Sequence, residues 1–359
     1  MKKKLLLLIA FLGILFYSFY WTKCSGVKRN TRQALEVYSA SAERIVFSGY
    51  TQGTYYRVVY YANDTIVTRK DIENVFENFL LTASIYDKNS LISKINRNGP
   101  TELNDDFVVI FNRAKEISSL TEGAFDVTVG NLVNAWGFGP KAGTDLTPEQ
   151  VQLLRKNVGY DNVDIVNGQV VKKDKEIELN FNAIAKGYSA DLVSRFLRQN
   201  KIENFLVNVG GEICASGKKA DGSPWVVGVE QPTADADDEA QMQTIIELTD
   251  KSLATSGTYR RYREEDGVRY SHTVDPRTGY PVSHTLLSAT VIADDCMTAD
   301  ALATAFMVLG KDEAMKFLEA HPQYEGYFIS SDTDDEFKVT YTKGFEKYIR
   351  NQQNVQVFR

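Results

Sequence analysis

An aspartate and a threonine four residues apart, Asp300 and Thr304, form the pair in this sequence best suited to hold a metal ion. They lie in Cys296–Gly310, an apolar, alanine-rich stretch that predicts a helix, and residues at i and i+4 share one helix face. A carboxylate beside a hydroxyl suits a hard cation such as Mg²⁺, which prefers oxygen ligands. The alternative is a core helix, in which Thr304 bonds its own backbone and the helix dipole favours Asp300 near the N-terminus. For one acid and one threonine, the core helix is the commoner outcome.

A second candidate site is Gly123–Gly139, an apolar segment with four glycines and Asp126 as its single charge. Its aromatic side chains, Phe125 among them, could stack on a flat ring system, while Asp126 could hydrogen-bond a ring or ribose edge. Equally, this is a core-lining loop in which Asp126 caps a helix over Val127–Val133. The residues leave both interpretations open.

Two further segments carry charged side chains that could act on a substrate. Leu179–Asp191 predicts a strand that turns into a helix at Ala183, so Lys186 and the exposed backbone amides of the first turn could bind an anion. A solvated lysine is the commoner alternative. Tyr270–Val282 carries His272, which is either a proton acceptor or a structural residue beside a turn.

Composition limits the functions that this chain can have. It has 359 residues, 43% of them hydrophobic, and so predicts an ordered protein with a large core in one or two domains. The net charge of −6 argues against a nucleic-acid partner, whose phosphates require clustered Lys and Arg. Cys214 and Cys296 are too few for a disulfide framework and are expected to be small core residues.

The N-terminus predicts a membrane anchor. Three lysines precede the apolar run Leu5–Trp21. This run is longer than a typical signal-peptide core and shorter than a typical membrane-spanning helix. Positive charges stay in the cytoplasm, so the body should face the other side, the periplasm in a diderm bacterium. Cys24 follows the apolar run closely and is a candidate for lipidation. Thr22 and Lys23 before it are not the small residues that such sites prefer, so an uncleaved anchor is favoured. The expected division is residues 1–23 as anchor, 24–44 as tether, 45–350 as catalytic domain and 351–359 as tail.

Apolar periodicity predicts the elements that position these residues. Helices are expected at Asp71–Ile85 and Asp106–Glu122, packed on one sheet face, and a small-residue turn in Ser252–Tyr262. Further helices are expected at Thr147–Val158 and Asp312–Ala320, and strands or hairpins at Ile45–Tyr61, Val163–Ile177, Phe205–Ile213, Trp225–Glu230, Thr244–Leu248, Leu286–Ala293, Tyr324–Ser330 and Phe337–Thr342.

No Walker loop, dinucleotide fingerprint, serine elbow or zinc-protease motif occurs in the chain. A Mg²⁺ site, an aromatic pocket and an anion-binding turn together suggest a metal-bridged aromatic nucleotide and phosphoryl chemistry.

The chain resembles the ApbE-type FAD:protein FMN transferases, also called flavin transferases. Eight motifs carry the resemblance in order between Gly49 and Gly310: GTYY (53–56), SIYDKNSLISKIN (84–96), GAFDVTVGNLVNAWGFG (123–139), AIAKGYSAD (183–191), VNVGGEI (207–213), ATSGTYRRY (254–262), HTVDPRTGYPV (272–282) and TADALATA (298–305). The resemblance implies an α/β (α+β), T-fold-like architecture with a mainly antiparallel sheet and flanking helices. It also implies FAD in a cleft, with Mg²⁺ on the pyrophosphate.

The resemblance assigns roles to individual residues. It implies that Asp300, Thr304 and the backbone carbonyl of Ala183 bind the metal. It implies FAD contacts at Gln52, Tyr86, Ala124, Phe125, Asp126, Asn180, Lys186 and Thr273. Gln52 stands where the family often has Met, and Asn180 where Asp is usual, so cofactor affinity or flavin selectivity could differ.

The implied reaction transfers FMN from FAD to a Thr or Ser hydroxyl of an acceptor protein and releases AMP. Lys186 and Mg²⁺ would draw charge from the pyrophosphate, and His272 would accept the hydroxyl proton or order its turn. The implied acceptors are flavin-carrying subunits of membrane redox complexes, which fits an enzyme anchored in the inner membrane and facing the periplasm. The alternatives are a Mg²⁺-dependent FAD pyrophosphatase and a membrane-tethered FAD-binding protein without activity, because all three need the same pocket.

Overall fold

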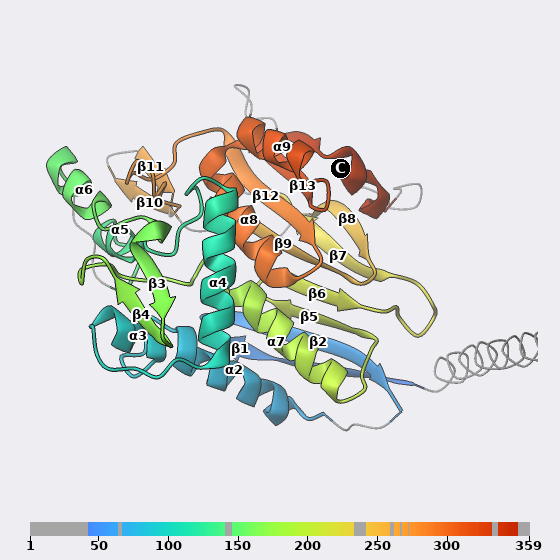
Figure 1. Ribbon diagram of the computed structural model, residues 1–359. Helices are drawn as coiled ribbons and strands as arrows, with labels where there is room; N and C mark the ends of the chain where they lie inside the picture. The colour runs from blue at the N-terminus through green and yellow to red at the C-terminus, as the bar shows by residue number, and fades with distance from the viewer. Residues whose placement is uncertain are drawn as a thin grey trace, which may run out of the picture.

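An eight-stranded antiparallel sheet forms the centre of the computed structural model, which describes residues 42–63, 67–140, 146–232, 242–258, 262–265, 268–271, 273–331 and 337–350. The strand order is β1-β2-β5-β6-β9-β12-β13-β14, so β1 and β14 are the edges (Figure 1). The strands are β1 (Glu43–Thr51), β2 (Thr54–Ala62), β5 (Phe205–Val209), β6 (Glu212–Ser216), β9 (Lys251–Gly257), β12 (Leu286–Ala293), β13 (Glu325–Ser331) and β14 (Phe337–Tyr341). This confirms the predicted mainly antiparallel sheet.

Three two-stranded ribbons accompany the main sheet. They are β3 (Val163–Val166) with β4 (Gln169–Lys172), β7 (Trp225–Glu230) with β8 (Met242–Leu248), and β10 (Tyr262–Glu265) with β11 (Val268–Ser271). The β7–β8 ribbon covers one face of the sheet, where Trp225, Ile246 and Phe345 belong to one apolar cluster with residues of β5, β6 and β9.

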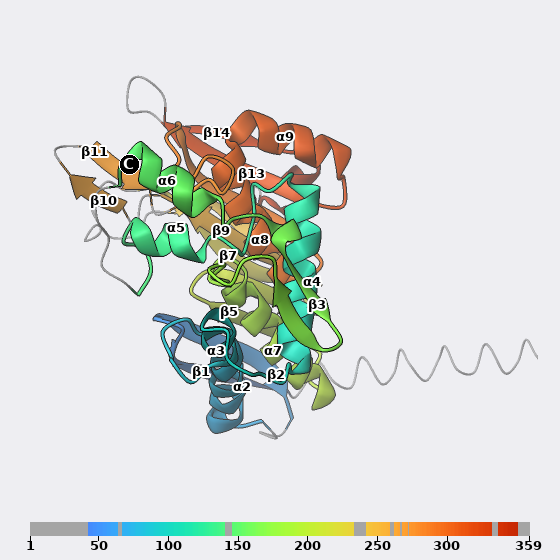
Figure 2. The same ribbon diagram turned by 60° about the vertical axis from the view of Figure 1, so that its left-hand side comes forward.

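Helices lie on the opposite side of the sheet, where some contact its strands directly and others pack on other helices (Figures 1 and 2). They are α2 (Arg69–Ala83), α3 (Leu91–Asn96), α4 (Asp105–Leu120), α5 (Gly130–Ala135), α6 (Pro148–Arg155), α7 (Ala185–Gln199), α8 (Cys296–Leu309) and α9 (Lys311–Ala320), with short 3-10 helices at Tyr160–Asn162 and Lys343–Tyr348. The expected helices are confirmed, and α2 and α6 begin at capping boxes formed by Thr68 with Asp71 and by Thr147 with Gln150.

Helix α8 is the most buried of the described helices, and every residue in it except Thr304 and Leu309 is buried. It packs on α7, β9 and β12. Its alanines at 299, 301, 303 and 305 have no exposed surface, so they allow close approach of these neighbours and do not leave open space around Asp300. A helix that is apolar all round is expected in the interior of a protein.

The sequence predictions for three segments were wrong. Ser252–Tyr262 was expected to be a turn, but Lys251–Gly257 is the strand between β6 and β12, where small side chains such as Ala254 fit beneath α8. Helix α4 was expected on the sheet with α2. It packs instead on α8 and α2, because α8 already occupies that face (Figure 1).

The third segment is the expected strand at Leu179, which is reduced to a single bridge between Glu178 and Val129. Helix α7 then begins at Ala185, two residues later than predicted. The residues between form a turn, because Asn180 Oδ1 accepts a hydrogen bond from Asn182 N and Phe181 O accepts one from Ile184 N.

The predicted membrane anchor Leu5–Trp21, Cys24 and the tail 351–359 lie outside the described residues. Within the described part of the chain, each helix is too short or too polar to cross a membrane. Cys214 and Cys296 are free and buried, which confirms the expectation that they are core residues.

Candidate active site

The start of α7 contacts the middle of α8 through Gly187 and Asp300. Asp300 is 3% exposed, and its Oδ2 accepts a hydrogen bond of 2.9 Å from Gly187 N. A Cβ atom at position 187 would lie 2.7 Å from the carbonyl carbon of Cys296 and 2.8 Å from Asp300 Cβ. Only glycine therefore allows this approach of the two helices, which places a carboxylate against the N-terminal turn of α7.

Ala183, whose backbone carbonyl the resemblance assigned to a metal ion, lies just before α7. The helix begins at Ala185, so Gly187 N is in its first turn, has no acceptor within the helix and donates to Asp300. Thr304 lies one turn after Asp300 on α8, and its hydroxyl is 3.2 Å from that of Ser256 on β9. A carboxylate, a carbonyl and a hydroxyl are hard oxygen donors, so these residues fit Mg²⁺, although metal binding by them stays a prediction. Groups of three or more His, Cys, Asp or Glu suited to a metal do not occur among the described residues.

A partly buried ion pair stands beside this oxygen cluster. Lys186, the second residue of α7, donates from Nζ to Oε1 of Glu212 at the start of β6. The Lys186 side chain is 32% exposed and that of Glu212 is 2% exposed. Burial raises the pKa of Glu212, against the opposing effect of Lys186. Burial lowers the pKa of Lys186, but the charges of Glu212 and Asp300 outweigh it, so that pKa is raised and the ammonium stays protonated.

The turn between β1 and β2 reaches the same end of α7. Gln52, which has a φ of 50°, donates from Nε2 to Ser189 Oγ at 2.7 Å, and Ser189 Oγ donates to the carbonyl of Lys186 at 2.8 Å. The structure thus brings Gln52, the Ala183–Lys186 segment and the α8 residues Asp300 and Thr304 together from three separate segments of the chain.

Asp126 anchors the glycine-rich loop. Its Oδ1 accepts from the backbone and hydroxyl of Thr128 at 2.8 and 2.7 Å, and its Oδ2 accepts from Tyr160 N at 2.8 Å. Burial raises the pKa of Asp126, while these hydrogen bonds lower it. These contacts support a structural role for Asp126, although not as the helix cap that the sequence suggested. Its carboxylate connects the glycine-rich loop to the segment at Tyr160 and does not cap α5. Asn180 N donates to the carbonyl of Val127, so this loop adjoins the segment that leads to Ala183.

The remaining predicted FAD contacts differ in their surroundings. Phe125 is 2% exposed and belongs to the main apolar cluster, so its ring packs in the core and is not free to stack on a flavin. Ala124 beside it is also buried, and Thr273 is partly buried. Tyr86 is 63% exposed, in the loop between α2 and α3. His272 lies outside the described residues.

The charged residues after His272 pair with each other. Asp275 and Arg277 form an ion pair with contacts of 2.9 and 3.0 Å. The turn packs on α5, because Trp136 Nε1 donates to the carbonyl of Gly279 at 2.9 Å. This second aromatic residue of the glycine-rich segment therefore fixes a loop.

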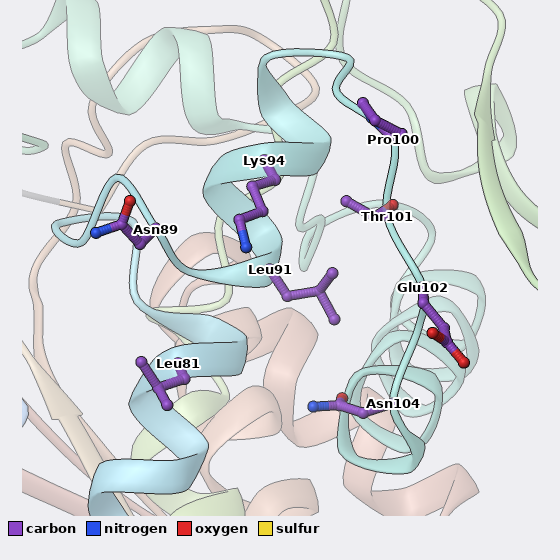
Figure 3. A pocket seen from close by; sticks show the side chains of 8 residues that line it. All are labelled: Leu81, Asn89, Leu91, Lys94, Pro100, Thr101, Glu102 and Asn104. Carbon is purple, nitrogen blue, oxygen red and sulfur yellow. The ribbon is translucent and has the colours of Figure 1, made fainter.

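A cavity of about 460 Å³ lies elsewhere, between α2, α3 and the start of α4 (Figure 3). Leu81 and Leu91 form apolar walls, and Lys94, Glu102 and Asn104 form polar ones. It shares no residue with the predicted site.

Sequence reasoning missed two acids near the candidate site. Glu212 lies in the motif VNVGGEI. An acid within a strand that is predicted to be buried could have indicated a site residue there. Asp191 ends the motif AIAKGYSAD, and its carboxylate accepts from the backbone N–H groups of Cys296 and Met297 at the start of α8. Burial and the charge of Asp295 raise the pKa of Asp191 to about 7.

Comparison with known proteins gives one consistent result. The model of the ApbE family matches residues 52–328. The FAD:protein FMN transferase of Vibrio cholerae is 38% identical over 317 residues, covering 86% of this chain and 93% of that protein. The solved structure of the flavin transferase ApbE from Vibrio cholerae has a TM-score of 0.76 at 37% identity, covering 86% of this chain and 99% of that one. The apo form of the Pseudomonas stutzeri flavinyl transferase ApbE has a TM-score of 0.77 at 31% identity, covering 86% and 97%.

Proposed function

The chain belongs to the ApbE family, and from this premise we propose that it transfers FMN from FAD to a Thr or Ser hydroxyl of an acceptor protein in a Mg²⁺-dependent reaction. It is an enzyme of the FAD:protein FMN transferase type. The observation that carries the proposal is the first turn of α7, where Lys186 pairs with Glu212 and the next residue, Gly187, donates its N–H to the buried carboxylate of Asp300.

The chemistry that this arrangement suits is the exchange of the phosphoanhydride bond of FAD for a phosphoester bond to the acceptor hydroxyl. The acceptor oxygen forms a bond to the FMN-side phosphorus of FAD, and the bond from that phosphorus to the bridging oxygen breaks. AMP leaves with the bridging oxygen, the hydroxyl proton is released, and FMN remains on the acceptor as a phosphoester. The ammonium of Lys186 would hold the negatively charged pyrophosphate and oppose the charge that grows on the leaving AMP.

Asp300, Thr304 and the carbonyl of Ala183 are the residues that would hold Mg²⁺. The ion would supply Lewis-acid stabilisation of charge on the phosphoryl oxygens. In addition, the hydrogen bond from Gly187 N fixes one carboxylate oxygen of Asp300, which orients the other.

We further propose that the N-terminal segment holds the enzyme in the inner membrane with its catalytic domain in the periplasm. The support is Leu5–Trp21 after three lysines. The acceptors would then be flavin-carrying subunits of membrane redox complexes on that side of the membrane.

The activity is tested with the full-length protein, FAD, Mg²⁺ and a candidate acceptor domain. We expect the acceptor to gain the mass of FMN while one AMP is released for each flavin attached. An acceptor with its target Thr changed to Val is the matched control and should stay unmodified. Equal release of free FMN and AMP with an unmodified acceptor would identify a pyrophosphatase instead, and binding of FAD without turnover would identify a flavin-binding protein.

The location is tested by deleting residues 1–24. The shortened protein should be soluble and should still modify an acceptor domain in vitro, because every predicted site residue follows Gly49. When it is retained in the cytoplasm of a deletion strain, the membrane target should lack covalent flavin. Restored flavin on that target would contradict the proposed topology.

A further inference from the structure

Glu212 is a buried acid beside the candidate site, and the proposed reaction gives it no role. We propose that Glu212 is a positioning residue that holds the ammonium of Lys186 away from Asp300, so that Asp300 stays available to a divalent cation. The effect of Glu212 on catalysis rests on the proposed function. The contacts from which the inference is argued are those among Lys186, Glu212, Gly187 and Asp300 in the structure.

The chain places Glu212 through a tight turn between β5 and β6. Gly210 and Gly211 have φ values of 66° and 108°, and Gly211 N donates to Asn208 Oδ1 at 2.9 Å. A Cβ atom at position 210 would lie 2.7 Å from Thr54 Cγ2, so the β5–β6 turn packs against the start of β2. Glu212 follows directly as the first residue of β6, with its side chain buried beside α7.

Stability does not account for an acid at this position. The other residues of β6, Ile213 to Ser216, are all buried, and an apolar side chain would avoid the cost of burying a charge. Moreover, the ion pair uses only Oε1. Glu212 Oε2 has no hydrogen-bond partner among the described residues, which is costly for a buried carboxylate oxygen. A buried acid with one unpaired oxygen is a candidate for a functional role.

Lys186 needs a partner because two acids attract it. Glu212 has the largest Coulomb effect on this ammonium and Asp300 the second largest. A lysine side chain has four rotatable bonds, so without Glu212 the strongest remaining attraction would draw it towards Asp300. An ion pair between Lys186 and Asp300 would neutralise the carboxylate that Mg²⁺ requires. In the structure Lys186 instead bonds Glu212, and Asp300 accepts from Gly187 N.

The test measures Mg²⁺ binding by calorimetry on the full-length protein, with and without FAD. Glu212→Gln should raise the dissociation constant of Mg²⁺ at least tenfold. Glu212→Asp should raise it similarly, because the shorter side chain keeps the charge but does not reach Lys186. The double variant Lys186→Met with Glu212→Gln should return Mg²⁺ affinity to within threefold of wild type, since no ammonium remains to occupy Asp300. Restored affinity in the double variant would also show that the loss in Glu212→Gln is not caused by misfolding.

Activity provides a second readout. FMN transfer by Glu212→Gln should recover as Mg²⁺ is raised, because the cation competes with Lys186 for Asp300, whereas a folding defect would not respond. Glu77→Gln is the matched control, since Glu77 pairs with Lys70 on the exposed face of α2. It should leave Mg²⁺ affinity unchanged.

Several results would overturn the inference. They are unchanged Mg²⁺ affinity in Glu212→Gln, wild-type affinity in Glu212→Asp, a double variant no better than the single one, or a wild-type protein that does not bind Mg²⁺. Failure of the proposed function looks different, because the affinity changes would then appear as expected while no acceptor gains FMN.

Discussion

Replacing Gly187 with alanine tests whether the contact between α7 and α8 builds the site. The added Cβ would meet backbone atoms of Cys296 and the Cβ of Asp300, all on a helix that is buried on every side. Neither neighbour is the flexible end of a side chain. We therefore expect the start of α7 to move away from α8 and the hydrogen bond from Gly187 N to Asp300 to break.

The expected loss of stability is about 3 kcal/mol. Overpacking a well-packed core costs about 1–3 kcal/mol. Loss of a hydrogen bond to a carboxylate costs about 1.5–3 kcal/mol. The higher helix propensity of alanine offsets up to about 1 kcal/mol of this. For a chain of this size, that corresponds to a fall in Tm of roughly 4 °C.

The assays are thermal unfolding and FMN transfer over a range of Mg²⁺ concentrations. Transfer should fall by about 100-fold, since a displacement of about 1 Å in positioning groups has that effect. Gly99→Ala is the control, because the nearest atom to its new Cβ is Lys94 O at 3.4 Å, an ordinary contact. Wild-type stability in Gly187→Ala would refute the close contact. A destabilised variant with normal transfer and Mg²⁺ dependence would show that the contact maintains the fold but not the reaction.

Three further predictions follow from single side chains. Asp300→Asn should abolish Mg²⁺-dependent transfer without lowering the Tm, because the amide oxygen still accepts from Gly187 N and burial already raises the pKa of Asp300; full activity would remove it from the metal site. Asp126→Ala should lower the free energy of unfolding by about 3 kcal/mol, because the N–H groups of Thr128 and Tyr160 lose their acceptor. An FAD titration of that variant shows whether binding also weakens, as expected for a cofactor contact. Asp191 has a pKa of about 7, above its unfolded value of about 3.9, so the free energy of unfolding should fall as pH rises from about 4 to 7. Asp191→Asn should reduce that slope in denaturation at several pH values, and an unchanged slope would contradict the raised pKa.

Local patterns predicted most elements of the fold correctly. The helices at Asp71–Ile85 and Asp312–Ala320 and the strand at Trp225–Glu230 were found because apolar spacing records which side of an element is buried. Strand β9 was missed for a physical reason. Its small residues are typical of turns by propensity, yet they are required in a strand that lies beneath the buried helix α8.

The candidate site divides in the same way between local and long-range contacts. Asp300 and Thr304 share a helix face because of the 3.6-residue period, so their proximity was readable from the chain. Lys186 and Glu212 are 26 residues apart, and Gly187 and Asp300 are 113 apart. These contacts depend on the register of β5 with β6 and on the close approach of two helices at a glycine, which residue spacing does not encode. The motifs identified the family and the residue types of the site. Tertiary packing determines which charged side chains form ion pairs, and it places Glu212 in a buried position beside Lys186.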